Sequence, residues 1–247
     1  MAYRFGIDAG SKTVKVVILD EDGTPVHSVY RRHLSNIRET LTDVLHNLAW
    51  RYGDLRGHAA VTGSAGIALA DMLGLPFVQE VVATTRAVEE VYPEADAVVE
   101  LGGEDAKVMY LSGNPEQRMN ATCAGGTGGF IDTIAFMLGV RSSEMSRLAG
   151  GANRIYPIAS RCAVFAQTDV RPFLNSGAKK SDIAASALEA VVRQTITGLA
   201  CGRPISGTVV FLGGPFEYVP ELTRRFRMAL GLKRGCGIKP RYAHLFT

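Results

Sequence analysis

A single cysteine stands before a run of glycines in the segment NATCAGGTGGF, residues 120–130. The thiol of Cys123 can act as a nucleophile, as a metal ligand, or as a small buried group with no chemical role. A nucleophile needs a paired base, and no histidine lies nearby in the sequence, although pairing in space stays open. The chain has no C-x-x-C run of the kind that often binds an iron-sulfur cluster. Its four cysteines are Cys123, Cys162, Cys201 and Cys236.

A second set of chemically useful residues occurs twice. Residues 5–19 align without a gap with residues 97–111, and the alignment matches Asp8 with Glu100, Gly10 with Gly102, Lys15 with Lys107, and Val16 with Val108. Glycines let backbone N–H groups approach phosphate oxygens, lysines supply positive charge, and carboxylates hold Mg²⁺ through water. The repeat indicates two phosphate-binding turns, with two ordinary β-hairpins as the alternative.

Strands bracket these turns. The β-rich runs are YRFGID, TVKVVILD, a third strand after the turn in DEDGTPVHSVYRR, and later runs near residues 57–62, 97–111 and 207–214. The last run ends in two glycines, and FLGGP at 211–215 offers a third glycine turn that can admit an adenosine.

Amphipathic helices separate the strands. Ser35 is expected to cap one helix and Ser181 a longer one. Apolar residues recur at helical spacing in both: Ile37, Leu41, Val44, Leu45 and Leu48 in the first, and Ile183, Ala187, Leu188, Val191 and Ile196 in the second. Strands that alternate with helices predict an α/β fold.

The composition excludes several classes of protein. The 247 residues are 47% hydrophobic and 21% charged with a net charge of +3, as in an ordinary globular chain of one large domain or two lobes. Basic residues are scattered apart from LKRGCGIKPR, so we expect neither a nucleic acid nor a membrane as partner. The opening MAYRFGIDAG reads as a strand and not as a secretory signal. We therefore expect a cytoplasmic protein with reduced thiols.

Five motifs in order resemble known families. IDAGSKTVK, ELGGEDAK and VFLGGP look like the two phosphate motifs and the adenosine motif of the actin, sugar kinase and Hsp70 superfamily. TCAGGTGGFID followed by SRCAVFAQTDV resembles one branch, the activators of 2-hydroxyacyl-CoA dehydratases and the related ATPase subunits of benzoyl-CoA reductase. The resemblance covers nearly the whole chain.

This resemblance implies a fold and a division of the chain. The fold would consist of two duplicated ribonuclease H-like lobes, residues 1–93 and 94–247, with an ATP cleft between them. The second lobe would carry the cluster cysteines.

The resemblance also implies a site for ATP or ADP with Mg²⁺. Asp8 and Glu100 would hold Mg²⁺ through water, and these two residues with Asp105 would be catalytic. The nucleotide would bind to residues of four glycine-containing segments: Gly10, Ser11, Lys12, Thr13, Lys15, Gly102, Gly103, Lys107, Gly125, Gly126, Thr127, Gly213 and Gly214.

A shared [4Fe-4S] cluster follows from the same resemblance. Such a cluster normally takes four thiolates, which two cysteines cannot supply but two chains related by a twofold axis can. The resemblance implies that Cys123 and Cys162 of each protomer bind one cluster in a homodimer, while Cys201 and Cys236 are expected to be buried thiols. Ferredoxin or flavodoxin would donate the electron. An iron-sulfur dehydratase or reductase would accept it, either as a separate protein or as part of the same full-length chain.

Some positions depart from the family pattern. Lys12 stands where the first phosphate motif usually has a threonine, Glu100 and Glu104 replace the commoner Asp and Gln, and Gly129 replaces a frequent arginine. ELGGEDAK and AHLF look more like long multidomain activase-like proteins, and relatives continue past YAHLFT into a terminal helix. We therefore expect this sequence to be a piece of a longer protein.

Two other functions stay open. A small-molecule or sugar kinase of the same fold would need an aspartate near a substrate hydroxyl, for which Asp105 and Asp132 are candidates. A nucleotide-sensing regulatory module would instead hydrolyse ATP poorly and act through a partner. The five histidines lack the spacing of a zinc site, and we expect them to be surface or capping residues.

Overall fold

The computed structural model describes residues 2–53, 56–120, 125–159 and 163–246. It contains two compact units. The first consists of Met1–Ala87 with Leu245–Thr247, and the second of Val88–His244.

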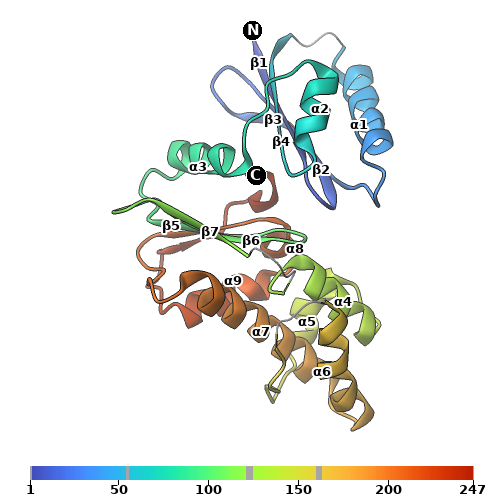
Figure 1. The fold of residues 1–247 in the computed structure, drawn as a ribbon, viewed down its shortest axis with the longest axis vertical. Coiled ribbons are helices and arrows are strands. Elements are labelled where there is room, and N and C mark those ends of the chain that lie inside the picture. The colour runs from blue at the N-terminus through green and yellow to red at the C-terminus, as the bar shows by residue number, and fades with distance from the viewer. Residues whose placement is uncertain (1, 54–55, 121–124, 160–162, 247) are drawn as a thin grey trace. The chain divides into compact units, whose positions relative to one another are not determined.

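A four-stranded sheet with the order β3-β2-β1-β4 forms the centre of the first unit (Figure 1). The first three strands make an antiparallel meander, and β4 joins β1 in parallel. Val14, Val16 and Ile18 alternate along β2 and share a buried cluster with Leu41 and Val44 of the first helix. The elements are β1 (Tyr3–Ala9), β2 (Thr13–Leu19), β3 (Pro25–Arg32), α1 (Ile37–Tyr52), β4 (Gly57–Thr62), α2 (Gly66–Leu73) and α3 (Glu80–Val91), which crosses the division between the units.

The start of α1 differs from the predicted one. The N-cap is Asn36 and not Ser35. Leu34 has a φ of 47° and Ser35 a φ of 68°, so both lie in the left-handed region. The prediction of a Ser35 cap was wrong because a tight turn, and not a hydroxyl cap, connects β3 to the helix.

A five-stranded sheet with the order β7-β6-β5-β8-β9 forms the centre of the second unit. β5, β6 and β7 again make an antiparallel meander, and β8 joins β5 in parallel. Every residue of β5 and β6 is buried, including the charged residues Glu100 and Lys107. The strands are β5 (Ala97–Leu101), β6 (Ala106–Tyr110), β7 (Glu116–Met119), β8 (Val209–Leu212) and β9 (Gly237–Ile238).

Helices complete the second unit around an aromatic core. The rings of Phe211, Phe216 and Phe226 lie with centroids 5.1 to 5.8 Å apart. Among the described residues, no helix has the length and apolar character needed to cross a bilayer. The helices are α4 (Gly128–Leu138), the 3₁₀ turn Ser142–Glu144, α5 (Met145–Ala149), α6 (Ala163–Asn175), α7 (Lys180–Ala200), α8 (Gly214–Tyr218), α9 (Pro220–Ala229) and the 3₁₀ turn Ala243–Leu245, whose last residue is assigned to the first unit.

Both ends of α7 differ from the predictions. The helix begins at Lys180, so Ser181 lies inside it and Lys179 is the N-cap. Cys201 follows its last residue with a φ of 44° and is exposed, so the expected buried thiol is wrong there. Cys236 is half-buried.

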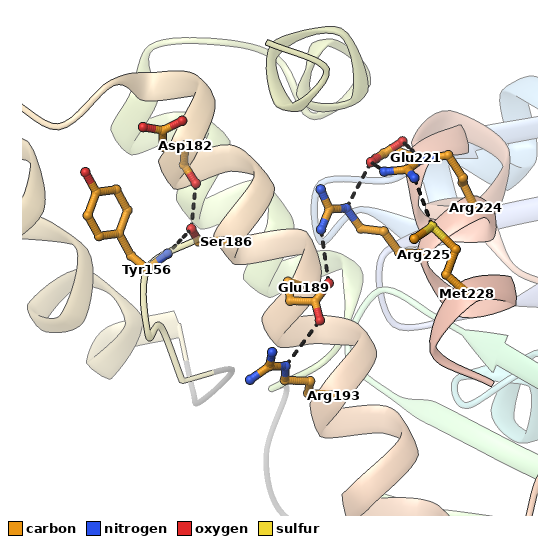
Figure 2. A network of polar contacts seen from close by, with 9 residues as sticks. All are labelled: Tyr156, Asp182, Ser186, Glu189, Arg193, Glu221, Arg224, Arg225 and Met228. Atoms are coloured by element: carbon orange, nitrogen blue, oxygen red, sulfur yellow. Dashed lines mark hydrogen bonds and ion pairs between the residues drawn. The ribbon is translucent and has the colours of Figure 1, made fainter. Parts of the chain in front are cut away.

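A network of ion pairs joins α7 to α9 (Figure 2). Arg225 of α9 donates to Glu189 of α7 and to Glu221 of its own helix, each over 3.0 Å. Arg224 pairs with the same Glu221, and Arg193 with Glu189. The Arg225–Glu189 pair crosses from α9 to α7 and holds the two helices against each other, while the other pairs lie within one helix.

Candidate functional site

The first acidic residue and lysine of the repeat form an ion pair in the first unit. Asp8 on β1 and Lys15 on β2 are directly opposite in the antiparallel register. The Lys15 ammonium lies 2.6 Å from Asp8 Oδ2, and Asp8 is only 4% exposed. Gly10 closes the turn between the strands through a 3.0 Å hydrogen bond from its N–H to the Thr13 carbonyl. Ser11 at the tip is exposed, whereas Lys12 and Thr13 are half-buried.

The second copy reproduces this arrangement in the second unit. Glu100 on β5 is opposite Lys107 on β6, and their charged groups are 3.3 Å apart. Lys107, which is 2% exposed, also lies 2.9 Å from the carboxylate of Asp105. The turn is closed by the Gly102 N–H, which donates to the Asp105 carbonyl. The three charged side chains predicted in this turn therefore form one cluster.

The carboxylate of Asp8 has unused capacity to accept hydrogen bonds. Its Oδ1 is buried and accepts no hydrogen bond from the described residues. Hydrated Mg²⁺ needs only one or two carboxylates, which accept hydrogen bonds from its water molecules. Among the described residues, no three His, Cys, Asp or Glu side chains gather as a direct metal cage. The donor set therefore fits a magnesium ion held through water and does not fit one held wholly by the protein.

Gly63 packs against Asp8 and Ala9 beside the first turn, and it was not predicted from the sequence. It follows β4 with a φ of 99°, and a Cβ there would overlap Asp8 Oδ1 and the Ala9 carbonyl. Gly213, which was predicted, follows β8 with the same φ of 99° and faces the Leu101 carbonyl in the same way. The two glycines thus occupy equivalent places in the two units. The signal was the glycine after a strand in VTGSAG, residues 61–66.

Three of the predicted glycine segments meet in the second unit. The N–H groups of Gly128 and Gly129, at the start of α4, donate to the carbonyls of Gly102 and Gly103 over 2.9 and 2.8 Å. A Cβ at Gly128 would also press on Pro215, which follows the Gly213–Gly214 pair. The turn at Gly102–Gly103, the start of α4 and the glycine turn after β8 are therefore adjacent. The predicted residues Gly125, Gly126 and Thr127 are buried just before α4.

The predicted cluster ligands lie outside the described residues. Cys123 is in the undescribed range 121–124 and Cys162 in 160–162. The helices that follow them in the sequence, α4 and α6, contact each other and lie side by side in Figure 1. The two helices that follow the predicted cluster ligands in the sequence therefore pack against each other.

The two aspartates that were candidates for the catalytic residue of a kinase both have polar partners in the structure. Asp105 pairs with Lys107, and Asp132 accepts a short hydrogen bond from the Ser142 hydroxyl.

A cavity of about 430 Å³ in the second unit is lined by residues 149, 150 and 152–155 and by Glu221, Arg224 and Arg225. None of the predicted site residues lines this cavity.

Comparison with known proteins decides the family. The model of the BadF/BadG/BcrA/BcrD ATPase family matches residues 5–224, which include both acid, glycine and lysine turns. The chain belongs to this ATPase family. The family resemblance that the motifs predicted is confirmed.

Relatives of this ATPase agree with that placement. The "(R)-2-hydroxyglutaryl-CoA dehydratase activating ATPase" of Acidaminococcus fermentans is 28% identical over 96% of this chain and 89% of the relative. The crystal structure of the (R)-2-hydroxyglutaryl-CoA dehydratase component A from that organism matches with a TM-score of 0.85 and 25% identity, over 100% of this chain and 94% of the other.

A nucleotide-bound structure is similar to the same extent. The activator of the 2-hydroxyisocaproyl-CoA dehydratase from Clostridium difficile, with bound ADPNP, matches with a TM-score of 0.83 and 25% identity, over 99% of this chain and 90% of that one. The order of the four strands in the first sheet recurs in the second, which adds β9 at its edge. Because the structure also agrees with these activators, the predicted fold class of duplicated α/β lobes is confirmed.

Proposed function

We propose that this ATPase is an activator that uses ATP to deliver a single low-potential electron to an acyl-CoA dehydratase or a related reductase. Similarity to two dehydratase activators over almost the whole chain supports this role. The observation that carries it is the duplicated buried pair, Asp8 with Lys15 and Glu100 with Lys107, in an ATPase whose structural relative binds ADPNP.

The residues of the two turns suit a nucleotide and its metal. We assign Lys15 and Lys107 to hold their carboxylate partners in place and to add positive charge near the phosphates. Asp8 and Glu100 accept hydrogen bonds from the waters of Mg²⁺, which supplies charge stabilisation at the phosphates when bound. Backbone N–H groups of the Gly10 and Gly102 turns, and of the Gly213–Gly214 turn, complete the contacts with ATP or ADP.

Cys123 and Cys162 are the thiolates we assign to a [4Fe-4S] cluster shared by two protomers. A cluster supplies a one-electron redox centre when it is bound. Support comes from α4 and α6, which follow the two cysteines and pack together. Both helices are long enough for the positive ends of their dipoles to stabilise an anionic group near their first turns.

ATP acts in this proposal through differential affinity. A nucleotide shifts a conformational equilibrium only by the difference in its affinity for the two states, and no substrate needs to be phosphorylated. Reduced ferredoxin or flavodoxin is the proposed donor in the cytoplasm, and an iron-sulfur dehydratase or reductase is the proposed acceptor. Asp105, which pairs with Lys107, is the third residue that we propose to be catalytic, with Asp8 and Glu100.

Iron and sulfide assays after anaerobic purification test the redox role. We expect about one [4Fe-4S] cluster per two chains and an EPR signal after dithionite reduction. Cys123→Ser and Cys162→Ser should each remove the iron, because each variant takes two of the four thiolates of the dimer.

Cys201→Ser is the matched control, since this exposed thiol at the end of α7 should not affect iron content. Wild-type protein that binds ATP normally but stays free of iron after anaerobic reconstitution would overturn the redox role. If its ATP hydrolysis then rose with an added sugar, the kinase alternative would gain support.

A further inference from the structure

His33 lies directly after β3 and contacts the first phosphate turn. It is 5% exposed, so the expectation that the histidines are surface or capping residues is wrong for this one. Its ring nitrogen Nε2 lies 3.1 Å from the carbonyl oxygen of Gly10. Its backbone N–H donates to the Lys12 carbonyl over 3.2 Å. One residue thus binds both a glycine and a lysine of the turn.

The second ring nitrogen determines which tautomer is present. The N–H of Ser35 donates to Nδ1 of His33 over 3.1 Å, so Nδ1 is an acceptor and carries no proton. A neutral imidazole with an acceptor at Nδ1 carries its proton on Nε2. Nε2–H therefore donates to the Gly10 carbonyl, and both nitrogens of the ring have defined roles.

The turn that holds this ring is strained. Leu34 and Ser35 both have positive φ values, which cost roughly 1 to 3 kcal/mol each in residues other than glycine. Packing does not explain the strain, because Leu34 is 86% exposed. The turn instead positions two hydrogen-bond donors around His33. The Ser35 N–H points at Nδ1, and the Asn36 N–H donates to the His33 carbonyl over 2.7 Å.

The hydrogen bond to Gly10 fixes the orientation of one peptide group. In a trans peptide the C=O of one residue and the N–H of the next point in opposite directions, and the described chain has no cis peptide. With its carbonyl held by His33, Gly10 cannot turn this peptide over, although glycine would otherwise permit it. The N–H of Ser11 is therefore directed away from His33, at the exposed tip of the turn.

We propose that His33 is a positioning residue that presents the Ser11 N–H to a phosphate oxygen of the bound nucleotide. This inference rests on the proposed ATP site and adds a residue that none of the motifs contains. A free Gly10–Ser11 peptide would expose its carbonyl to the phosphates in part of the molecules. A carbonyl oxygen repels an anion where an N–H binds it.

The second unit contains a comparable contact. Asn120 is also the first residue after the third strand of its meander. Its Oδ1 accepts the N–H of Ala106 over 2.6 Å, and its own N–H donates to the Ala106 carbonyl over 3.1 Å. Each unit therefore uses a polar residue at this place to fix the backbone at its phosphate turn.

Two substitutions of His33 distinguish a role in positioning the Ser11 N–H from a role in the stability of the fold. His33→Asn keeps an acceptor for the Ser35 N–H, as in an Asx-turn, but its short side chain does not reach the Gly10 carbonyl. His33→Gln reaches that carbonyl with an amide N–H but loses the acceptor at the place of Nδ1. We expect His33→Asn to weaken the binding of ADPNP with Mg²⁺ about tenfold, the effect of losing one well-placed hydrogen bond. His33→Gln should bind within about threefold of wild type.

Calorimetric titration with ADPNP and Mg²⁺, together with urea unfolding of each variant, provides the readout. Equal affinity of His33→Asn and wild type would overturn the inference. It would also fail if both variants lost affinity in proportion to their loss of stability. Wild-type protein that does not bind ADPNP would instead refute the proposed ATP site itself.

Discussion

The charged residues of the repeat act as pairs at the residue scale. Lys107 is almost completely buried, and Glu100 and Asp105, which lie within 3.3 Å, compensate its charge. Removing one partner of a buried pair costs more than the pair contributes, since a buried charge remains. The identity of these residues is thus fixed by burial as well as by their proposed contact with phosphates.

Gly63 allows a test of how closely Asp8 is confined. Gly63→Ala should destabilise the protein by about 3 kcal/mol, because a φ of 99° is unfavourable for alanine and its Cβ would overlap Asp8 and the Ala9 backbone. Displacement of Asp8 should also weaken binding of ADPNP with Mg²⁺. Urea unfolding and calorimetric titration measure the two effects.

Gly6→Ala is the matched control for this change. Gly6 lies on β1, the strand that carries Asp8, and a Cβ at this position would meet no atom within 4 Å. It should be neutral or slightly stabilising. Equal unfolding midpoints for the two variants would show that Gly63 does not confine Asp8.

Hairpins were the elements best predicted from the sequence. The acid and the lysine are seven residues apart in both copies, and a tight glycine turn at that spacing places them opposite each other. Helix starts were predicted less well. Ser35 and Ser181 looked like caps, but the turn held by His33 and a start at Lys180 determine the helix ends.

Glu221 at the start of α9 gives the α7 and α9 pair a defined pH dependence. Hydrogen bonds from Arg224, together with the charges of Arg224 and Arg225, hold the pKa of Glu221 below its usual value of 4.5. A carboxyl with a lowered pKa in the folded state stabilises the fold above the unfolded value, and this contribution is lost as the pH falls through the folded pKa. The network in Figure 2 should therefore weaken in acid.

Comparison with Glu221→Gln isolates this contribution. The variant should be less stable than wild type at pH 7, and the difference should shrink as the pH is lowered below 4.5, because the protonated glutamate then resembles glutamine. Urea unfolding across this pH range measures it, with exposed Glu90→Gln on α3 as the control. A difference that stays constant with pH would show that the carboxylate charge is not involved.

At the scale of the whole molecule, the sequence showed only part of the duplication of the two units. Residues 5–19 and 97–111 align without a gap, but Gly63 and Gly213 do not follow at the same spacing. The second unit inserts α4, α5 and α6 between its meander and its β8 strand, which breaks any gapless alignment. Contacts such as His33 with Gly10 escaped prediction because they join residues 23 positions apart through a turn with no sequence signature.

The cluster assignment could be made only from the family resemblance. Cys123 and Cys162 are 39 positions apart, so their spacing alone indicates no shared site. In the structure, α4 and α6, the helices that follow the two cysteines in the sequence, pack against each other. Coupling of that cluster to the nucleotide is then the central claim of the proposed function.

Redox potentiometry under anaerobic conditions tests this coupling most directly. If ATP makes the electron more reducing, the nucleotide must bind the oxidised protein more tightly than the reduced protein, and linkage then lowers the midpoint potential. We predict a lower midpoint with ADPNP and Mg²⁺ than with ADP and Mg²⁺, and loss of that difference in Asp8→Asn. Identical midpoints in wild-type protein saturated with either nucleotide would contradict the proposal that ATP drives the electron.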